Sequence, residues 1–123
     1  MFAAGDVIAF ESIEAGKRKY HLCISLDGHY VFLNSPKVLV YAGDYVVPCT
    51  EIPGVPVTPS GKSIISCTLV MQKSDADLKA AKAKKLGTVK KQLLIDLAKF
   101  VMLSPILTDE EKEAFLAAAG DWI

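Results

Sequence analysis

The sequence lacks the cysteine patterns that mark several common protein classes. Its three cysteines are odd in number, widely spaced and without a CxxC pair, which argues against a disulfide framework and against a zinc pattern. All three lie in apolar, strand-like runs. We therefore expect free, buried thiols in a reducing cytoplasm at Cys23, Cys49 and Cys67.

Membrane and secretion signals are also missing. No apolar run approaches the ~20 residues of a membrane span. The start, MFAAGDVIAF, has neither the basic region nor the long apolar region of a signal peptide. We expect a cytoplasmic protein that has no contact with a membrane.

The residues that bind metals and cofactors are scarce. The chain has two histidines, and no spacing of acids, histidines and cysteines matches a known ligand set. The GKS at residues 61–63 lacks the first glycine of a phosphate-binding P-loop and precedes a strand. We expect neither a metal nor a cofactor.

The formal net charge is zero, but the charges are unevenly distributed. Residues 73–91 carry seven lysines and two aspartates, whereas residues 92–123 carry two lysines and six acids. A basic segment beside an acidic tail can be an anion-binding face, or a solvated helix that pairs with the tail. The sequence leaves both interpretations open.

The first part of the chain reads as short strands. Apolar, β-branched runs bounded by glycine and polar residues are typical of strands. The stretch TEIPGVPVTPSGK holds three prolines and is expected to be a loop or an edge, because proline supplies no backbone donor. The expected strands cover residues 6–11, 20–26, 29–33, 38–41, 45–49 and 63–71.

The second part reads as helices. Ser74 is expected to cap a helix over residues 75–86, and a second helix is expected over residues 88–103, before Pro105. Thr108 and Glu111 have the spacing of a capping box that opens a third helix. The pattern predicts a single α+β domain over residues 1–123. It comprises a small, strongly bent barrel of five to six short antiparallel strands in 1–72 and two to three packed C-terminal helices in 73–123.

Asp27-Gly28 is a strong hairpin signal between two apolar runs. A two-residue turn there places His21 opposite Asn34 and Tyr20 opposite Ser35. A three-residue loop with a bulge would shift this pairing. His29, beside the turn, is expected to be solvated.

Strand alternation then separates two faces of the hairpin. The face with Tyr20, Leu22 and Leu33 is the expected core side. On the other face, Lys19, His21 and Asn34 meet at one solvent-open rim, where a cation, an imidazole and an amide could bind a phosphate and move a proton. Exposed Tyr30 and Phe32 beside them could stack bases. Alternatively, helices or a partner subunit cover the aromatic rings, and His21 only bonds to Asn34.

Five short motifs follow one another along the chain: GDVI at 5–8, KYHLCIS at 19–25, NSPK at 34–37, SIISC at 63–67 and KKLGTV at 84–89. Each motif is weak alone. Their order and spacing over residues 5–103 resemble those of the PemK/MazF family of toxins from toxin–antitoxin modules.

This resemblance implies a small, usually dimeric SH3-like barrel that cleaves single-stranded RNA without a metal, through attack of the 2′-hydroxyl. It implies catalytic roles for Lys19 and Ser35, with His21 as a replacement acid or base. The implied partners are single-stranded RNA, an antitoxin protein and a second copy of the chain. The implied substrate-binding residues are Arg18, Tyr30, Phe32, Asn34 and Lys37.

The chain departs from the family at its two main positions. The family has Arg-Pro where this chain has Lys19-Tyr20, and lysine is a point charge rather than a bidentate fork. The family's threonine aligns with Asn34, which cannot shuttle a proton. Two alternatives remain: a non-catalytic SH3-like module that binds RNA or a protein or peptide partner, its groove gated by the Pro-rich loop 53–59, or a dimerisation unit whose helices mask the hairpin face.

Overall fold

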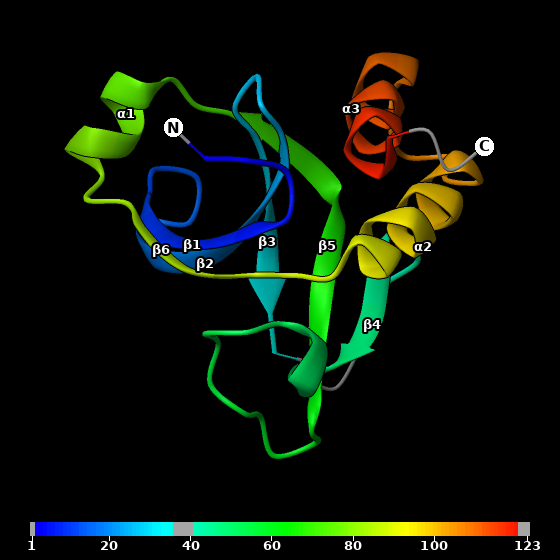
Figure 1. The fold of residues 1–123 in the computed structure, drawn as a ribbon, viewed down its shortest axis with the longest axis horizontal. Helices are drawn as coiled ribbons and strands as arrows, with labels where there is room; N and C mark the ends of the chain where they lie inside the picture. The colour runs from blue at the N-terminus through cyan, green and yellow to red at the C-terminus, as the bar shows by residue number, and fades with distance from the viewer. Residues whose placement is uncertain (1, 36–40, 121–123) are drawn as a thin grey trace.

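The computed structural model describes residues 2–35 and 41–120, which form an α+β fold (Figure 1). The strands are β1 (Asp6–Ser12), β2 (Lys17–Ser25), β3 (His29–Asn34), β4 (Asp44–Pro48), β5 (Lys62–Gln72) and β6 (Lys84–Thr88). The helices are α1 (Asp75–Ala80), α2 (Lys91–Met102) and α3 (Asp109–Ala119), with a 3₁₀ turn at Cys49–Glu51. The predicted α+β class is confirmed.

The six strands make one antiparallel sheet in the order β4-β5-β3-β2-β1-β6. Its two edges, β4 and β6, do not pair with each other, so the sheet is open. The closed SH3-like barrel predicted from the sequence is not confirmed.

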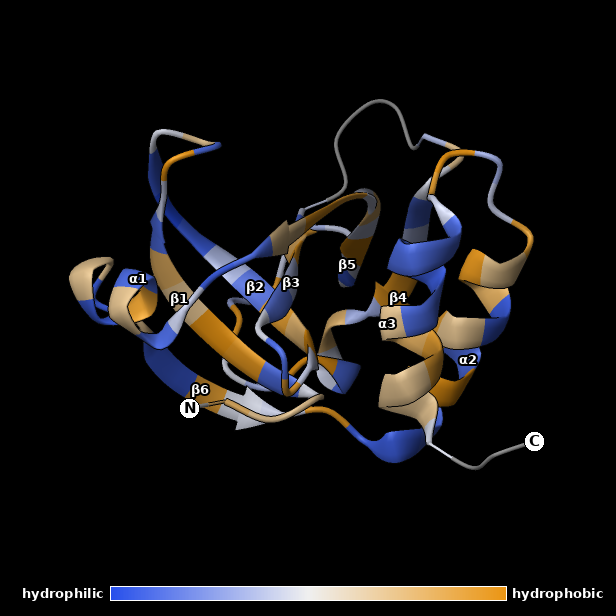
Figure 2. Ribbon diagram, turned by 90° about the horizontal axis from the view of Figure 1, so that it is seen from above, coloured by the Kyte–Doolittle hydropathy of each residue, from blue (hydrophilic) through white to orange (hydrophobic). Residues whose placement is uncertain are grey.

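Both faces of the sheet are covered. One face packs against α2 and α3, with Val7, Leu22 and Leu33 in the shared core. The other face holds Phe10, with further apolar side chains, under Leu78 of α1. Figure 2 shows α1 on one side of the sheet and the α2–α3 pair on the other. Strand alternation therefore buries apolar side chains in two separate cores.

The helix starts follow the sequence signals at two of the three helices. Thr108 Oγ1 accepts from Glu111 N at 3.2 Å and Glu111 Oε1 accepts from Thr108 N at 2.9 Å, which completes the capping box of α3. Ser74 caps α1 in the same way. The short third helix expected at the C-terminal end of the chain is therefore confirmed.

The helix expected over residues 75–86 is confirmed only from Asp75 to Ala80, and its expected extent is wrong. α1 ends at Ala80, Lys82 adopts a φ of 55°, and the chain then forms β6 along β1. Pairing with the edge of β1 satisfies the backbone there, which overrides the helix propensity of a lysine- and alanine-rich segment. For the same reason α2 begins at Lys91 rather than at Thr88.

The strand expected over residues 38–41 can be compared with the structure at Tyr41 only. Residues 38–40 lie outside the described residues, and so does Lys37. Tyr41 is described and does not belong to a strand. Cys23, Cys49 and Cys67 are buried and free, as predicted. None of the helices within the described ranges is long and apolar enough to cross a membrane.

Candidate functional site

The β2–β3 turn determines which side chains meet at the site. Gly28 has a φ of +83° and its N–H donates to Ser25 O at 3.2 Å, so the loop has three residues and a bulge rather than two residues. His21 consequently lies opposite Phe32, not Asn34. The predicted register is wrong by two residues. Because side chains alternate with a period of two, this shift leaves each of them on its predicted face.

Lys19 and Asn34 are in direct contact, as the sequence predicts for that face. Lys19 Nζ donates to Asn34 Oδ1 and lies 5.4 Å from the centroid of the Phe32 ring. Asn34 Nδ2 donates to Ser66 Oγ at 2.9 Å, and Ser66 Oγ donates to Asp44 Oδ1 at 3.4 Å. Ser66 and Asp44 could not be recognised as partners of Asn34 from the sequence, because they lie on β5 and β4, outside the hairpin.

His21 does not reach solvent. Its exposed fraction is 0%, and its ring stacks on Phe10 with 3.6 Å between centroids. Nδ1 lies 3.0 Å from Lys19 O, and Nε2 is buried without a hydrogen-bond partner among the described residues. Burial lowers the pKa of His21 to about 4, so the ring is neutral at pH 7. The predicted solvent-open imidazole is therefore wrong, and we assign His21 no chemical role.

The aromatic residues of the same face are covered to different degrees. Tyr30 is 1% exposed, packs edge-on against Phe10, and burial raises the pKa of its hydroxyl. Phe32 is half-buried. Because β1 and α1 close this face, Tyr30 cannot stack a base, and the prediction for it is wrong. His29 is half-buried and bonds through Nδ1 to Ser25 Oγ at 2.6 Å, so it is not simply solvated.

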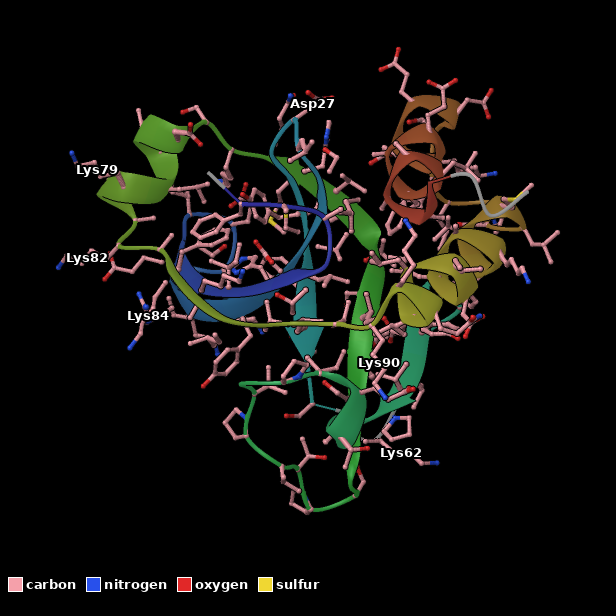
Figure 3. The ribbon with its side chains drawn as sticks, in the orientation of Figure 1. Asp27, Lys62, Lys79, Lys82, Lys84 and Lys90 are labelled. Carbon is pink, nitrogen blue, oxygen red and sulfur yellow. The ribbon has the colours of Figure 1, made fainter. Side chains whose placement is uncertain are left out.

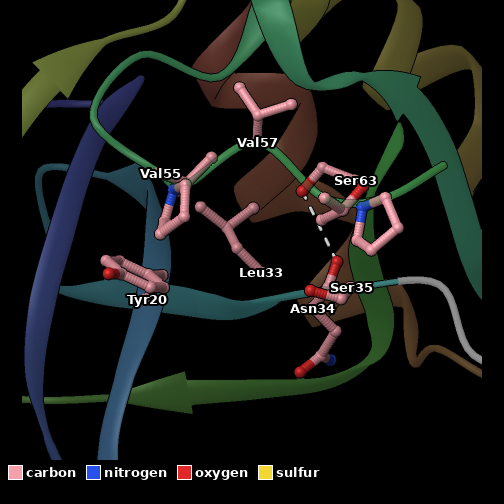
Figure 4. A pocket seen from close by; sticks show the side chains of 10 residues that line it. Tyr20, Leu33, Asn34, Ser35, Val55, Val57 and Ser63 are labelled. Carbon is pink, nitrogen blue, oxygen red and sulfur yellow. Dashed lines mark hydrogen bonds between the residues drawn. The ribbon is translucent and has the colours of Figure 1, made fainter. Parts of the chain in front are cut away.

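A groove lies beside the start of β2 and the end of β3. One cavity of about 200 Å³ is bounded by Tyr20, Leu33, Ser35, Ser63 and the loop 55–59 (Figure 4). A second cavity of about 390 Å³ is bounded by Ala9, Arg18, Lys19, Tyr20, Gly54 and Leu86. Tyr20 lines both cavities, and we call the pair the Tyr20 groove. None of the described residues that line it is acidic.

The Pro-rich loop forms one wall of the groove and is packed closely on β6. A Cβ atom on Gly54 would lie 2.5 Å from Leu86 Cβ, and one on Gly87 would lie 2.9 Å from Pro53 Cβ. On the opposite side of the loop, Ser63 Oγ donates to Asn34 O at 3.4 Å. Backbone contact at these glycines therefore sets the width of the groove.

Two basic side chains, Arg18 and Lys19, line the second cavity, and further lysines lie nearby in the sequence of its β6 wall. Arg18, the only arginine of the chain, is exposed and donates from Nη1 to Lys82 O at 3.1 Å. Lys84 and Lys85 follow on β6, where Lys85 pairs with Asp6 at 3.2 Å. Figure 3 shows Lys79, Lys82 and Lys84 on one side of the molecule. The basic segment noticed in the sequence therefore borders the groove through its edge strand.

The predicted site residues lie on one face of the sheet and in the groove, and Lys19 and Asn34 belong to both. Lys19, with its contact to Asn34, shares that face with His21, Tyr30 and Phe32. Arg18 and Lys19 line the second cavity of the groove, and Asn34 and Ser35 line the first. Tyr20 lines the groove, although strand alternation predicts it on the core side of the hairpin. The proline-rich run that faces it was the one signal in the sequence that could have indicated a groove there.

Within the described residues, no group of three or more His, Cys, Asp or Glu side chains is placed so that it could hold a metal ion.

No family model matches the chain, and neither a curated protein nor a solved structure matches it significantly.

Proposed function

We propose that this chain is a PemK/MazF-like protein that binds single-stranded RNA in the Tyr20 groove. The observation that supports the proposal is the composition of the groove wall. It combines an aromatic ring with Arg18 and Lys19, and no acid is found among its described lining residues. An aromatic ring stacks unpaired bases, and cations attract phosphates. The open sheet would then be a divergent form of the SH3-like barrel.

Single-stranded RNA fits the groove better than a duplex. Unpaired bases can be splayed out, stacked on a tyrosine ring and bonded along their edges, whereas paired bases cannot. Ser35 and Thr58 bring hydroxyl groups to the first cavity, and a hydroxyl can both donate to and accept from a base or a 2′-hydroxyl. An antitoxin and a second copy of the chain are proposed partners on the resemblance alone.

Cleavage of the bound RNA is the second candidate function. The contact between Lys19 and Asn34 favours it, because these residues occupy the two positions at which the family resemblance places its catalytic pair. In this reaction the 2′-hydroxyl gives its proton to water and attacks the adjacent phosphate, and the 5′-oxygen of the next nucleotide leaves and takes up a proton from water. Lys19 and Arg18 would stabilise the charge that develops on the phosphate, while Ser35 would orient it. The buried His21 takes no part.

One experiment separates the two candidates. The purified protein is incubated with a mixed single-stranded RNA in EDTA, and the RNA ends and the binding anisotropy are both measured. Binding with new 2′,3′-cyclic phosphate ends supports binding and cleavage. Binding to intact RNA supports the module that binds without cleaving. Neither binding nor cleavage at low salt would rule out both functions.

Replacing Tyr20 should weaken RNA binding. If a base stacks on this ring, Tyr20→Leu should lose about 1–3 kcal/mol of binding free energy, roughly a 5- to 150-fold rise in Kd. Tyr20→Phe keeps the ring and serves as the matched control. Fluorescence anisotropy with a labelled oligonucleotide measures both variants; equal affinity of Tyr20→Leu and wild type would show that no base rests on Tyr20.

Removing the charges of Lys82 and of the first two residues of β6 should flatten the salt dependence of RNA binding. Each phosphate contact contributes about 0.7 to the slope of log K against log salt on single strands. We expect a smaller slope for Lys82→Gln/Lys84→Gln/Lys85→Gln. A control that removes three charges from α2 and α3, Lys91→Gln/Lys99→Gln/Lys112→Gln, should keep the wild-type slope. If the first variant also keeps it, Lys82, Lys84 and Lys85 do not touch phosphate.

A further inference from the structure

We infer that Asp44, Ser66 and Asn34 are positioning residues that hold the Lys19 ammonium ready for a phosphate. This inference rests on the proposed RNA-binding function. The sequence motifs singled out Lys19 and Asn34 only. Asp44 and Ser66 enter through the hydrogen bonds that join them to this pair.

The four residues form an unbroken chain of side-chain hydrogen bonds across four adjacent strands. Asp44 on β4 lies directly opposite Ser66 on β5. Ser66 accepts from Asn34 on β3 at 2.9 Å, and Asn34 accepts from Lys19 on β2. The strands follow one another in the sheet as β4, β5, β3 and β2, so each link spans a single inter-strand gap. We call these four residues the polar ladder.

The two ends of the polar ladder fix the direction of every hydrogen bond. An ammonium only donates and a carboxylate only accepts. Asn34 must therefore turn Oδ1 toward Lys19 and Nδ2 toward Ser66, and the Ser66 hydroxyl must donate to Asp44 Oδ1 at 3.4 Å. Asp44 is itself anchored, because its Oδ2 accepts from Tyr41 N at 2.9 Å. The ladder thus connects an anchored carboxylate to the ammonium with one consistent polarity.

Such a ladder reduces the cost of binding an anion. A free lysine side chain has considerable rotamer entropy, which is lost when the ammonium is held against a ligand. Lys19 is half-buried, and both the Asn34 amide and the Phe32 ring restrain it before any RNA arrives. An ammonium carries three donors, so the contact with Asn34 is compatible with a phosphate contact. Asn34 suits this position because its side-chain amide accepts from the ammonium through Oδ1 and donates to the serine through Nδ2 at once.

The test uses Ser66→Ala, Ser66→Thr and, as the matched control, Thr68→Ala on the same strand. Ser66→Ala removes the central link, whereas Ser66→Thr keeps the hydroxyl. Thr68 is exposed on β5 and belongs neither to the ladder nor to the lining of the groove. The first readout needs no RNA: the ¹⁵Nζ resonance of Lys19 in protein labelled on lysine. We expect a protected, slowly exchanging Lys19 signal in wild type, Ser66→Thr and Thr68→Ala, and its loss in Ser66→Ala.

The second readout is RNA affinity as a function of salt. Losing one hydrogen bond of the ladder should raise Kd about two- to tenfold in Ser66→Ala, and Ser66→Thr should restore it. The salt slope should be unchanged, because no charge is removed, whereas Lys19→Met should lower the slope. Asp44→Asn, which keeps one acceptor, should resemble wild type more than Asp44→Ala does.

The outcomes separate the ladder from the proposed function. An identical Lys19 signal in wild type and Ser66→Ala would overturn the ladder, whether or not RNA binds. A protected signal that disappears in Ser66→Ala, in a protein that binds no RNA, would keep the ladder as a structural device and overturn its role toward phosphate. A Ser66→Ala variant that binds RNA as tightly as wild type would also overturn that role.

Discussion

Lowering the pH from 7 to 4.5 should reduce the free energy of unfolding by about 2 kcal/mol through His21 alone. The effect comes from the placement of the imidazole. His21 is fully buried against Phe10, and burial lowers its pKa from 6.5 to about 4. In the unfolded chain the ring regains its ordinary pKa and binds a proton near pH 6.5.

The sign follows from the protons bound in each state. Between pH 6.5 and pH 4 the unfolded chain carries the His21 proton and the folded chain does not. Stability therefore rises with pH across this window and falls on acidification. The full contribution is present above the unfolded pKa, and it decreases as the pH drops below 6.5 toward 4.

Urea unfolding at a series of pH values measures this effect. His21→Phe keeps a ring beside Phe10 but cannot titrate, so its stability should depend less on pH between 6.5 and 4 than that of wild type. The matched control is Tyr30→Phe, which changes another ring beside Phe10 but removes no group that titrates between pH 4 and 6.5, and it should keep the wild-type dependence. Parallel pH profiles for His21→Phe and wild type would show that His21 is not buried as a neutral ring.

Gly54→Ala should damage both the fold and the groove. Gly54 has a φ of +88°, and a Cβ there would lie 2.5 Å from Leu86 Cβ and 2.9 Å from Leu86 O. The unfavourable backbone conformation alone costs about 1–3 kcal/mol. The clash cannot be relieved by rotating a side chain, because the atoms it meets are the Cβ and backbone of β6. The loop must move away from β6, which widens the second cavity of the Tyr20 groove.

A matched substitution separates conformational strain from displacement of the loop. Gly61 ends the same loop with a φ of +72°, but a Cβ there meets no atom within 4 Å. Gly61→Ala should therefore lose stability through strain alone and keep its RNA affinity. Gly54→Ala should lose more stability and bind RNA about tenfold more weakly, or 1.4 kcal/mol. Thermal unfolding and anisotropy measure the two effects; equal RNA affinity in the two variants would show that the loop does not shape the binding surface.

Local signals in the sequence predicted most of the elements. The capping residues Ser74 and Thr108 mark the starts of α1 and α3 because the hydrogen bonds of a cap are made within four residues. Alternation placed Lys19 and Asn34 on one face correctly, even though the register was wrong. Local patterns could not predict β6, because a lysine-rich segment becomes a strand only where the edge of β1 is available to pair with it.

The burial of His21 could not be predicted from the sequence of its hairpin either. The hairpin places the ring on a face, but Phe10 of β1 and the chain around α1 decide whether that face meets solvent. The Tyr20 groove depends on a close approach between Gly54 and Leu86, which are 32 positions apart in the chain. Asp44 and Ser66 likewise join Asn34 only after β5 pairs with both β3 and β4.

The most direct test of the account is an NMR titration of ¹⁵N-labelled protein with a short single-stranded RNA at low salt. If RNA binds in the Tyr20 groove, amide shifts should concentrate at Arg18, Tyr20, Ser35 and the loop 54–59, and α3 should remain unperturbed. Shifts confined to α2 and α3, or no shifts at all at millimolar RNA, would contradict the central claim that this groove is the functional site.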